Sequence, residues 1–259
     1  MVNLGRRWVA IAALGALAGL CIAMRSDALP RPRAHLSARV HLLPARTLWV
    51  WERPEDLQAI DAAKMAIAWL DQTLVIGDGL VSVPRRQPVA YPAGAVRIAV
   101  VRIEALPAAN LDVEQEKKTV ELLIHSAERP GIAALQVDFD ATRLQRAFYA
   151  DVLTELRRQM PAGLPLSMTA LASWCSSDDW IGNLPVDEAV PMMFRMEPDR
   201  RRAPADAAGF RIREPLCMGS VGISTHEAWP DDIAGKRIYV FADRGWRQDF
   251  SLLADRKLP

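Results

Sequence analysis

The chain has 259 residues, of which 51% are apolar and 24% are charged, and its formal net charge is +1. This length suits one large domain or two small ones, and the residue balance is that of an ordinary globular protein. The near-zero net charge argues against nucleic acid as a partner, because nucleic-acid-binding domains carry a strong basic excess.

The first 28 residues have the pattern of an export signal. Arg6 and Arg7 form a basic flank, and an uncharged apolar run follows from Trp8 to Met24. The small residues at 26–28 offer a cleavage site, so residues 1–28 are predicted to be a signal peptide. A retained membrane anchor is the alternative, because the run is just long enough to span a bilayer. We therefore expect an exported protein, periplasmic or secreted, which meets a membrane only through this segment.

Export bears on the cysteines. If Cys21 leaves with the signal peptide, Cys175 and Cys217 remain in a compartment that permits disulfides. The sequence does not show whether the two Cα atoms lie close enough to be bridged. One disulfide and two buried thiols both stay open at this point.

The remaining chain reads as a linker followed by repeated βα units. Residues 29–45 contain prolines and arginines without periodicity and are predicted to be the linker. From residue 46 to 259, short apolar runs alternate with polar or helical stretches. Eight strands are expected, at 47–52, within 66–76, and at 95–104, 132–140, 164–173, 188–196, 220–225 and 237–243.

Helices are expected between some of these strands. Long ones should lie at 113–128, 141–160 and 246–257, and short ones at 179–184 and 230–235. The stretch 75–83 looks like an added hairpin, because Asp78-Gly79 suits a tight primed turn.

Eight strands with interleaved helices predict an α/β fold, a small TIM-like (β/α)8 barrel over residues 46–259 with some short or missing helices. A doubly wound open sheet is the alternative, but it usually has a glycine-rich phosphate turn after its first strand. Here the sequence WVWERPEDL stands at that place. Pro191 falls inside the sixth strand and predicts a bulge or a short strand there.

Two carboxylates end the fourth strand. Strand alternation places Gln136, Asp138 and Asp140 on one face, and Val137 and Phe139 on the other. The apolar pair should pack under the helices, and the polar series should climb the barrel interior to its mouth. Functional groups of such barrels collect at this C-terminal end of the strands.

The other strand ends are also polar, and several tryptophans lie beside them. Carboxylates supply the acid, base or nucleophile of glycosidic cleavage, and indoles offer flat faces to sugar rings. This predicts a polysaccharide or oligosaccharide partner. The residues nominated for substrate binding are Glu52, Arg102, Trp51, Trp174, Arg195, Glu197, Asp243 and Trp246.

Other chemistries find less support. The chain has no His/Cys spacing typical of a zinc site, no G-x-S-x-G elbow and no phosphate loop. No metal and no cofactor are therefore expected. Structural roles compete with the catalytic ones: Asp140 could cap the following helix, Asp138 could pair with Arg102 or Arg195, and any one tryptophan could belong to the core.

Four stretches, VDFD (137–140), LSMTALASWC (166–175), VDEAVPMMFRM (186–196) and GISTHE (222–227), resemble a bacterial family known as domain of unknown function 3142. The resemblance implies a barrel related to glycoside hydrolases and transfers no activity.

The stretch LQVDFDAT also resembles the fourth-strand signature Asp-x-x-Asp-x-Asp-x-Glu of chitinase-like barrels. Asp138 and Asp140 match its second and third acids, while Leu135 replaces the first acid and Thr142 stands where the catalytic Glu would be. This departure argues against chitinase-type, substrate-assisted hydrolysis. The resemblance to retaining barrels nominates Glu227, after the seventh strand, as a catalytic partner, with Glu197 in reserve.

Two functions follow as hypotheses. The first is an exported glycoside hydrolase with Asp140, Asp138 and Glu227 as catalytic residues. In it, Asp138 is expected to be an ion-paired positioning group, and Asp140 to be free for proton transfer or nucleophilic attack. The second is a non-catalytic barrel that binds a glycan or another envelope protein.

Overall fold

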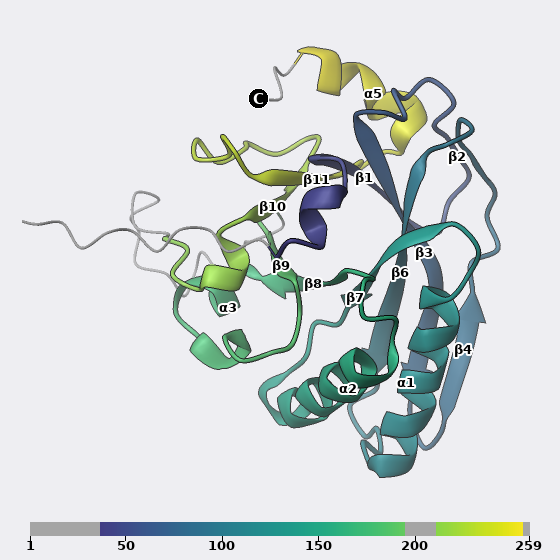
Figure 1. The fold of residues 1–259 in the computed structure, drawn as a ribbon, viewed down its shortest axis with the longest axis vertical. Coiled ribbons are helices and arrows are strands. Elements are labelled where there is room, and N and C mark those ends of the chain that lie inside the picture. Colours follow the sequence, from purple (N-terminus) through teal and green to yellow (C-terminus); the bar gives the residue numbers. More distant parts are fainter. Residues whose placement is uncertain (1–36, 195–210, 256–259) are drawn as a thin grey trace, which may run out of the picture. The chain divides into compact units, whose positions relative to one another are not determined.

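The computed structural model describes residues 37–194 and 211–255, and in them eight parallel strands close into a barrel (Figure 1). The strands pair in the order β1-β11-β10-β9-β8-β7-β6-β3, and the ring closes because β1 also pairs with β3. This confirms the predicted barrel and excludes an open sheet. The strands are β1 (Arg46–Val50), β3 (Met65–Ile76), β6 (Val96–Ala105), β7 (Ile132–Asp138), β8 (Leu166–Leu171), β9 (Glu188–Met192), β10 (Ser220–Ser224) and β11 (Arg237–Phe241).

In residues 37–194 and 211–255, helices follow only some of the strands. The α-helices are α1 (Val113–Ala127), α2 (Arg146–Gln159), α3 (Ala172–Ser176) and α5 (Trp246–Asp255). Single 3-10 turns lie at η1 (Val40–Leu42), η2 (Arg143–Gln145), η3 (Asp179–Ile181) and η4 (Pro215–Cys217). The short helix expected at 230–235 is wrong, because this stretch forms a turn.

Short strands replace helices early in the chain. The expected hairpin is present, since β4 (Leu80–Pro84) pairs antiparallel with the end of β3. Three residues, 77–79, connect the two strands, so the loop is longer than the two-residue turn expected. The strands β2 (Glu55–Asp56) and β5 (Val89–Ala90) form a separate two-stranded sheet.

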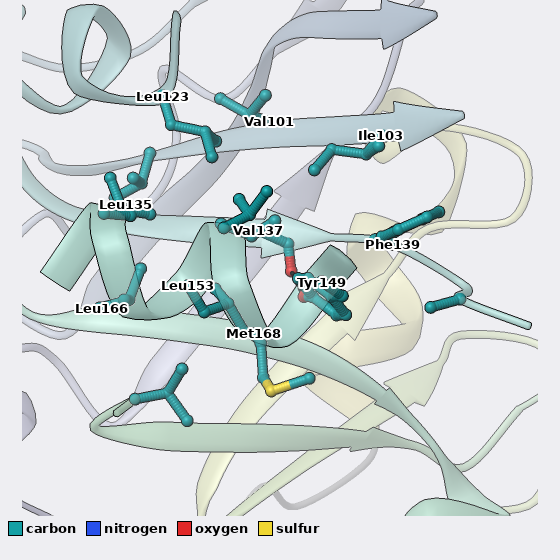
Figure 2. Close-up of a cluster of buried hydrophobic side chains, with 14 of the residues drawn as sticks. Val101, Ile103, Leu123, Leu135, Val137, Phe139, Tyr149, Leu153, Leu166 and Met168 are labelled. Atoms are coloured by element: carbon teal, nitrogen blue, oxygen red, sulfur yellow. Dashed lines mark hydrogen bonds between the residues drawn. The ribbon is translucent and has the colours of Figure 1, made fainter. Parts of the chain in front are cut away.

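The largest hydrophobic cluster lies outside the ring, between its strands and the helices α1 and α2. Figure 2 shows Tyr149 and Leu153 of α2 against Val137 and Phe139. The rings of Phe139 and Tyr149 are 5.1 Å apart. These contacts confirm that the apolar pair of the fourth strand faces the helices, so the alternate residues Gln136 and Asp138 face the interior.

The barrel interior is filled by aromatic and small side chains. The Trp49 indole packs 5.2 Å from the Tyr239 ring and donates a 2.6 Å hydrogen bond from Nε1 to Gln136 Oε1. Gln136 in turn donates to Ser167 Oγ at 3.0 Å. A Cβ added at Gly222 would lie 2.8 Å from Trp49 Cη2, so glycine at this position makes room for the indole. The packed Trp49 indole fills the lower part of the barrel, and the open space lies above it, at the mouth.

Residues 37–45, which the sequence assigns to the linker, pack against the N-terminal end of the barrel. Arg39 donates to Asp187 at 2.9 Å, and Val40 and Leu43 are buried beside Trp49. The Leu43 carbonyl accepts from Arg237, which also binds the fully buried Glu188. Through these contacts, residues 37–45 help to hold the N-terminal end of the barrel together.

Pro191 is accommodated by a short strand, as expected. It lies in the five-residue β9, whose ladder with β10 has a single Cα pair, Met192 opposite Gly222. The backbone N–H of Met193 extends the contact by donating to the Gly222 carbonyl at 2.8 Å. The backbone N–H that proline lacks is therefore missing from the β9–β10 contact, which has the fewest paired residues in the ring.

Cys175 and Cys217 form a disulfide, with their Cα atoms 5.8 Å apart. The bond joins α3 to η4, and both residues are buried. Of the two alternatives left open by the sequence, the disulfide is confirmed.

Three predictions fall on residues outside the described part of the chain. These are the signal or anchor at 1–28, and the substrate-binding roles of Arg195 and Glu197. Within residues 37–194 and 211–255, no helix is both long enough and apolar enough to cross a membrane.

Candidate functional site

A cleft of about 270 Å³ lies at the C-terminal end of the barrel strands. Three of its side chains are charged, and most of the others are aromatic or aliphatic. The lining consists of Trp49, Trp51, Arg102, Asp138, Asp140, Thr169, Leu171, Ala172, Met192, Phe194 and Phe241. The nominated residues Asp138, Asp140, Arg102 and Trp51 are thus brought together from three segments of the chain.

Asp138 is held rigidly at the floor of this cleft. It is 3% exposed and stands directly opposite Arg102 in the β6–β7 register. Arg102 Nη1 donates to its Oδ2 at 3.1 Å, and Thr169 Oγ1 donates to its Oδ1 at 2.6 Å. Burial raises the pKa of Asp138 above its usual value, and the contacts with Arg102 and Thr169 oppose that rise. The expected ion pair with Arg102 is therefore present.

Asp140 lies two residues beyond β7 and is exposed at the cleft. Among the described residues, its carboxylate has no hydrogen-bond or ion-pair partner. Partial burial raises the pKa of Asp140, the neighbouring charge of Asp138 adds to the rise, and Arg102 opposes it. A carboxyl in this setting keeps its proton to a higher pH than an ordinary aspartate.

The alternative that Asp140 only caps the next helix is wrong. Thr142 is the N-cap of η2, and it forms a capping box with Gln145, whose Oε1 accepts from the Thr142 N–H at 2.8 Å. The cap is thus filled two residues further along, and Asp140 remains available to a ligand.

Arg102 connects the acids to the aromatic wall. Its Nε donates to Glu104 at 2.7 Å, and its guanidinium lies 5.8 Å from the centre of the Trp51 ring. The Arg102 side chain is 36% exposed, whereas that of Asp138 is 5% exposed. The buried member of the ion pair is therefore the acid.

The aromatic wall contains residues that the sequence reasoning missed. Phe194 and Phe241 stack with their ring centres 5.6 Å apart, and Trp51 meets Phe241 edge-on at 6.4 Å. Trp49 closes the floor, 6.1 Å from Phe194. Strand alternation could have found these rings, because Trp49 shares a face with Trp51, and Phe194 shares one with Met192.

Two nominated tryptophans do not reach this cleft. Trp174 is 2% exposed and packs edge-on against Trp180 at 4.9 Å. Trp246 is fully buried, and its Nε1 donates to the Trp49 carbonyl at 2.8 Å. Because each residue lies in a helix that folds back onto the barrel, its ring joins the core and offers no face to a sugar.

The nominated Glu52 also has a structural role. This exposed residue accepts from the backbone N–H groups of Arg86 and Gln87, at 3.0 and 3.1 Å. It thereby holds the loop that follows β4, and it does not line the cleft.

Glu227 and Asp243 lie in loops beyond the ends of β10 and β11. Glu227 is half-buried and does not line the cleft that contains Asp140. Asp243 accepts a hydrogen bond from Ser224 Oγ, at the end of β10. The structure therefore does not place Glu227 among the cleft residues as a catalytic partner of Asp140. In the described part of the chain, no group of three or more His, Cys, Asp or Glu residues could hold a metal ion.

Replacing Arg102 by Met is expected to lower the free energy of unfolding by about 2–3 kcal/mol at neutral pH. The change leaves the Asp138 carboxylate buried without its cation, which costs about 3–5 kcal/mol in a fully buried pair. The partial exposure of Arg102 reduces that cost.

Chemical denaturation at several pH values measures this effect. Loss of the cation raises the pKa of Asp138 further, so the deficit should shrink as the pH falls and Asp138 takes up a proton. The double variant R102M/D138N should lose less stability than R102M alone. A deficit that is equal at all pH values would contradict this account.

Part of this barrel matches the model of a known protein family. The model of the family described as Domain of unknown function (DUF3142) matches residues 93–198. The match includes β6 to β9 and therefore Arg102, Asp138, Asp140 and Thr169. The resemblance seen in the sequence is confirmed over these residues.

Two solved structures are similar to this chain. One is the chitinase domain of the spore coat protein CotE from Clostridium difficile, at 14% identity and a TM-score of 0.40, covering 57% of this chain and 49% of that chain. The other is the Bacillus cereus spore cortex-lytic enzyme SleL, at 16% identity and a TM-score of 0.38, covering 57% of this chain and 41% of that one. The chain thus spans half or less of their length. No curated protein matches it.

Proposed function

We propose that the barrel acts on a polysaccharide or oligosaccharide, and that Asp140 carries the proton transfer of a glycoside-hydrolase-like reaction. The observation behind this proposal is a carboxyl with a raised pKa that has no partner among the described residues and lies beside an aromatic wall. A general acid works best when its pKa approaches the working pH. Two neighbouring acids can take different roles when their surroundings give them different pKa values.

The neighbouring groups support this role. Asp138 is fixed by Arg102 and Thr169, and it adds to the rise in the pKa of Asp140. Trp51 and Phe241 supply apolar surface of the kind that packs on the C–H face of a sugar ring. In this arrangement Asp140 exchanges the proton, and Asp138 acts as a positioning group.

Non-catalytic glycan binding is the second candidate, and one observation favours it. Glycosidic cleavage uses a pair of carboxyl groups, whereas Asp140 is the only carboxyl of the described cleft lining without a partner in the described residues. A cleft with one such acid and several aromatic rings would suffice to hold a sugar.

We also propose that the protein works outside the cytoplasm. Disulfides persist in oxidising compartments, and the Cys175–Cys217 bond is consistent with the export signal predicted at residues 1–28. A retained anchor would leave the barrel on the outer side of the inner membrane.

A degradation screen on purified secreted protein tests the proposal. Bacterial and cell-surface polysaccharides are incubated with the protein, new reducing ends are measured, and the same polymers are tested for binding on a glycan array. Release of oligosaccharides supports hydrolysis. Binding without release supports the second candidate, and the absence of both contradicts each of them.

A further inference from the structure

The described cleft carries a negative charge that its own cation does not balance. Its titratable lining residues are Arg102, Asp138 and Asp140. Arg102 is shared between Asp138 and Glu104, at 3.1 and 2.7 Å. Because Arg102 is shared in this way, it offsets the charge of Asp140 only in part, so an ionised Asp140 makes the cleft an attractive place for a ligand cation.

A second arginine near the wall is already committed. Arg53 lies 5.8 Å from the centre of the Phe241 ring. Its Nε pairs with Glu55 at 2.7 Å, and its Nη atoms donate to the carbonyls of Ala242 and Asp243. Its charge is therefore balanced by Glu55, and it does not line the cleft.

The aromatic wall favours positive charge as well. Trp, Tyr and Phe rings attract a cation within about 6 Å of the ring centre, more strongly where water is excluded. Trp51 and Phe241 each already have a guanidinium at this distance. An acid beside several rings is the chemistry that recognises an ammonium group.

We infer that the cleft takes a glycan unit with a free, protonated amino group, as found in an amino-sugar polymer that lacks some of its acetyl groups. The inference rests on the proposed function for the sugar, and on Asp140 and the aromatic wall for the charge. An N-acetylated unit carries no cation, and an acidic sugar would be repelled by Asp140. At about 270 Å³, the cleft is at the small end of ligand pockets, which suits the recognition of one such unit.

The pH dependence of binding has a defined sign. Binding of an ammonium group needs the ionised form of Asp140, whose pKa is raised by burial and by Asp138. Affinity should therefore rise as the pH rises through that pKa, and fall again where the amine loses its proton. It should also weaken with added salt, because the attraction lies at a partly exposed site.

Calorimetric titration of the full-length oxidised protein tests the inference. The probes are the glucosamine hexasaccharide, the N-acetylglucosamine hexasaccharide and tetramethylammonium. The glucosamine oligomer should bind at least about tenfold more tightly than the acetylated one, since a hydrogen bond to a charged group contributes enough for that ratio. D140N should remove this preference. D151N, a matched change at an exposed position of α2, should keep it.

Each other outcome has a distinct meaning. Equal or tighter binding of the acetylated oligomer would overturn the cationic ligand and leave the proposed glycan function standing. Binding of tetramethylammonium with neither oligomer would overturn the amino sugar as the ligand, while the degradation screen decides the proposed function. A preference for glucosamine that survives in D140N would overturn the role of Asp140 in binding. No binding of any probe would overturn the inference, while the degradation screen decides the proposed function.

Discussion

Replacing Asp140 by Asn is expected to lower turnover of a polysaccharide substrate about 100- to 10,000-fold, the range that proton transfer by a positioned side chain contributes. The amide keeps the shape of the side chain but cannot carry the proton. The change should be close to neutral for folding, because Asp140 is exposed and makes no hydrogen bond or ion pair with a described residue.

Stability is the control that separates chemistry from folding. The pKa of Asp140 is raised in the fold, so above that pKa its ionised form opposes folding and its loss removes no stabilising contact. The free energy of unfolding of D140N should stay within about 0.5 kcal/mol of the parent. Full turnover in D140N would contradict the catalytic role of this residue.

Removing the disulfide with the double variant C175A/C217A is expected to lower the free energy of unfolding by about 4 kcal/mol at 25 °C. The two cysteines are 42 residues apart, and in the chain-entropy account the gain in unfolded-state freedom grows with the length of the loop that the bond closes. Both side chains are buried, so the substitution adds a small packing loss.

Denaturation with and without a reductant isolates the contribution of the bond. The parent should lose stability when it is reduced, and the double variant should not respond to the reductant. A parent whose transition is the same in both conditions would show that the bond contributes nothing. The expected loss is large beside the about 5–15 kcal/mol of a typical domain.

Several features of the site followed from local sequence rules. Each strand of a parallel barrel is a short apolar run, so the eight runs located the strands within a few residues. Alternation with a period of two put Val137 and Phe139 under α2 and Asp138 in the interior. These properties depend on residues that are near neighbours in the chain, which is why composition and spacing were sufficient.

Other features depended on which strands lie side by side and in what register. Asp138 forms its ion pair with Arg102 because β6 and β7 are adjacent. A register shift near Arg97 places the two residues opposite each other. The same ring closure gathers Trp51, Phe194 and Phe241 into one wall, although they come from widely separated strands.

The sequence by itself determined the barrel, the paired acids and the polar strand ends, because backbone periodicity is a local property. Only the tertiary structure decided which of those polar ends form the cleft. The sequence suggested Trp174 and Trp246 as residues that bind a sugar ring. Both lie in the core, because the helices that carry them fold back onto the barrel. Glu227 follows β10 as Asp140 follows β7, but its loop keeps it out of the cleft lining. Burial depends on contacts between distant segments, and no local pattern records them.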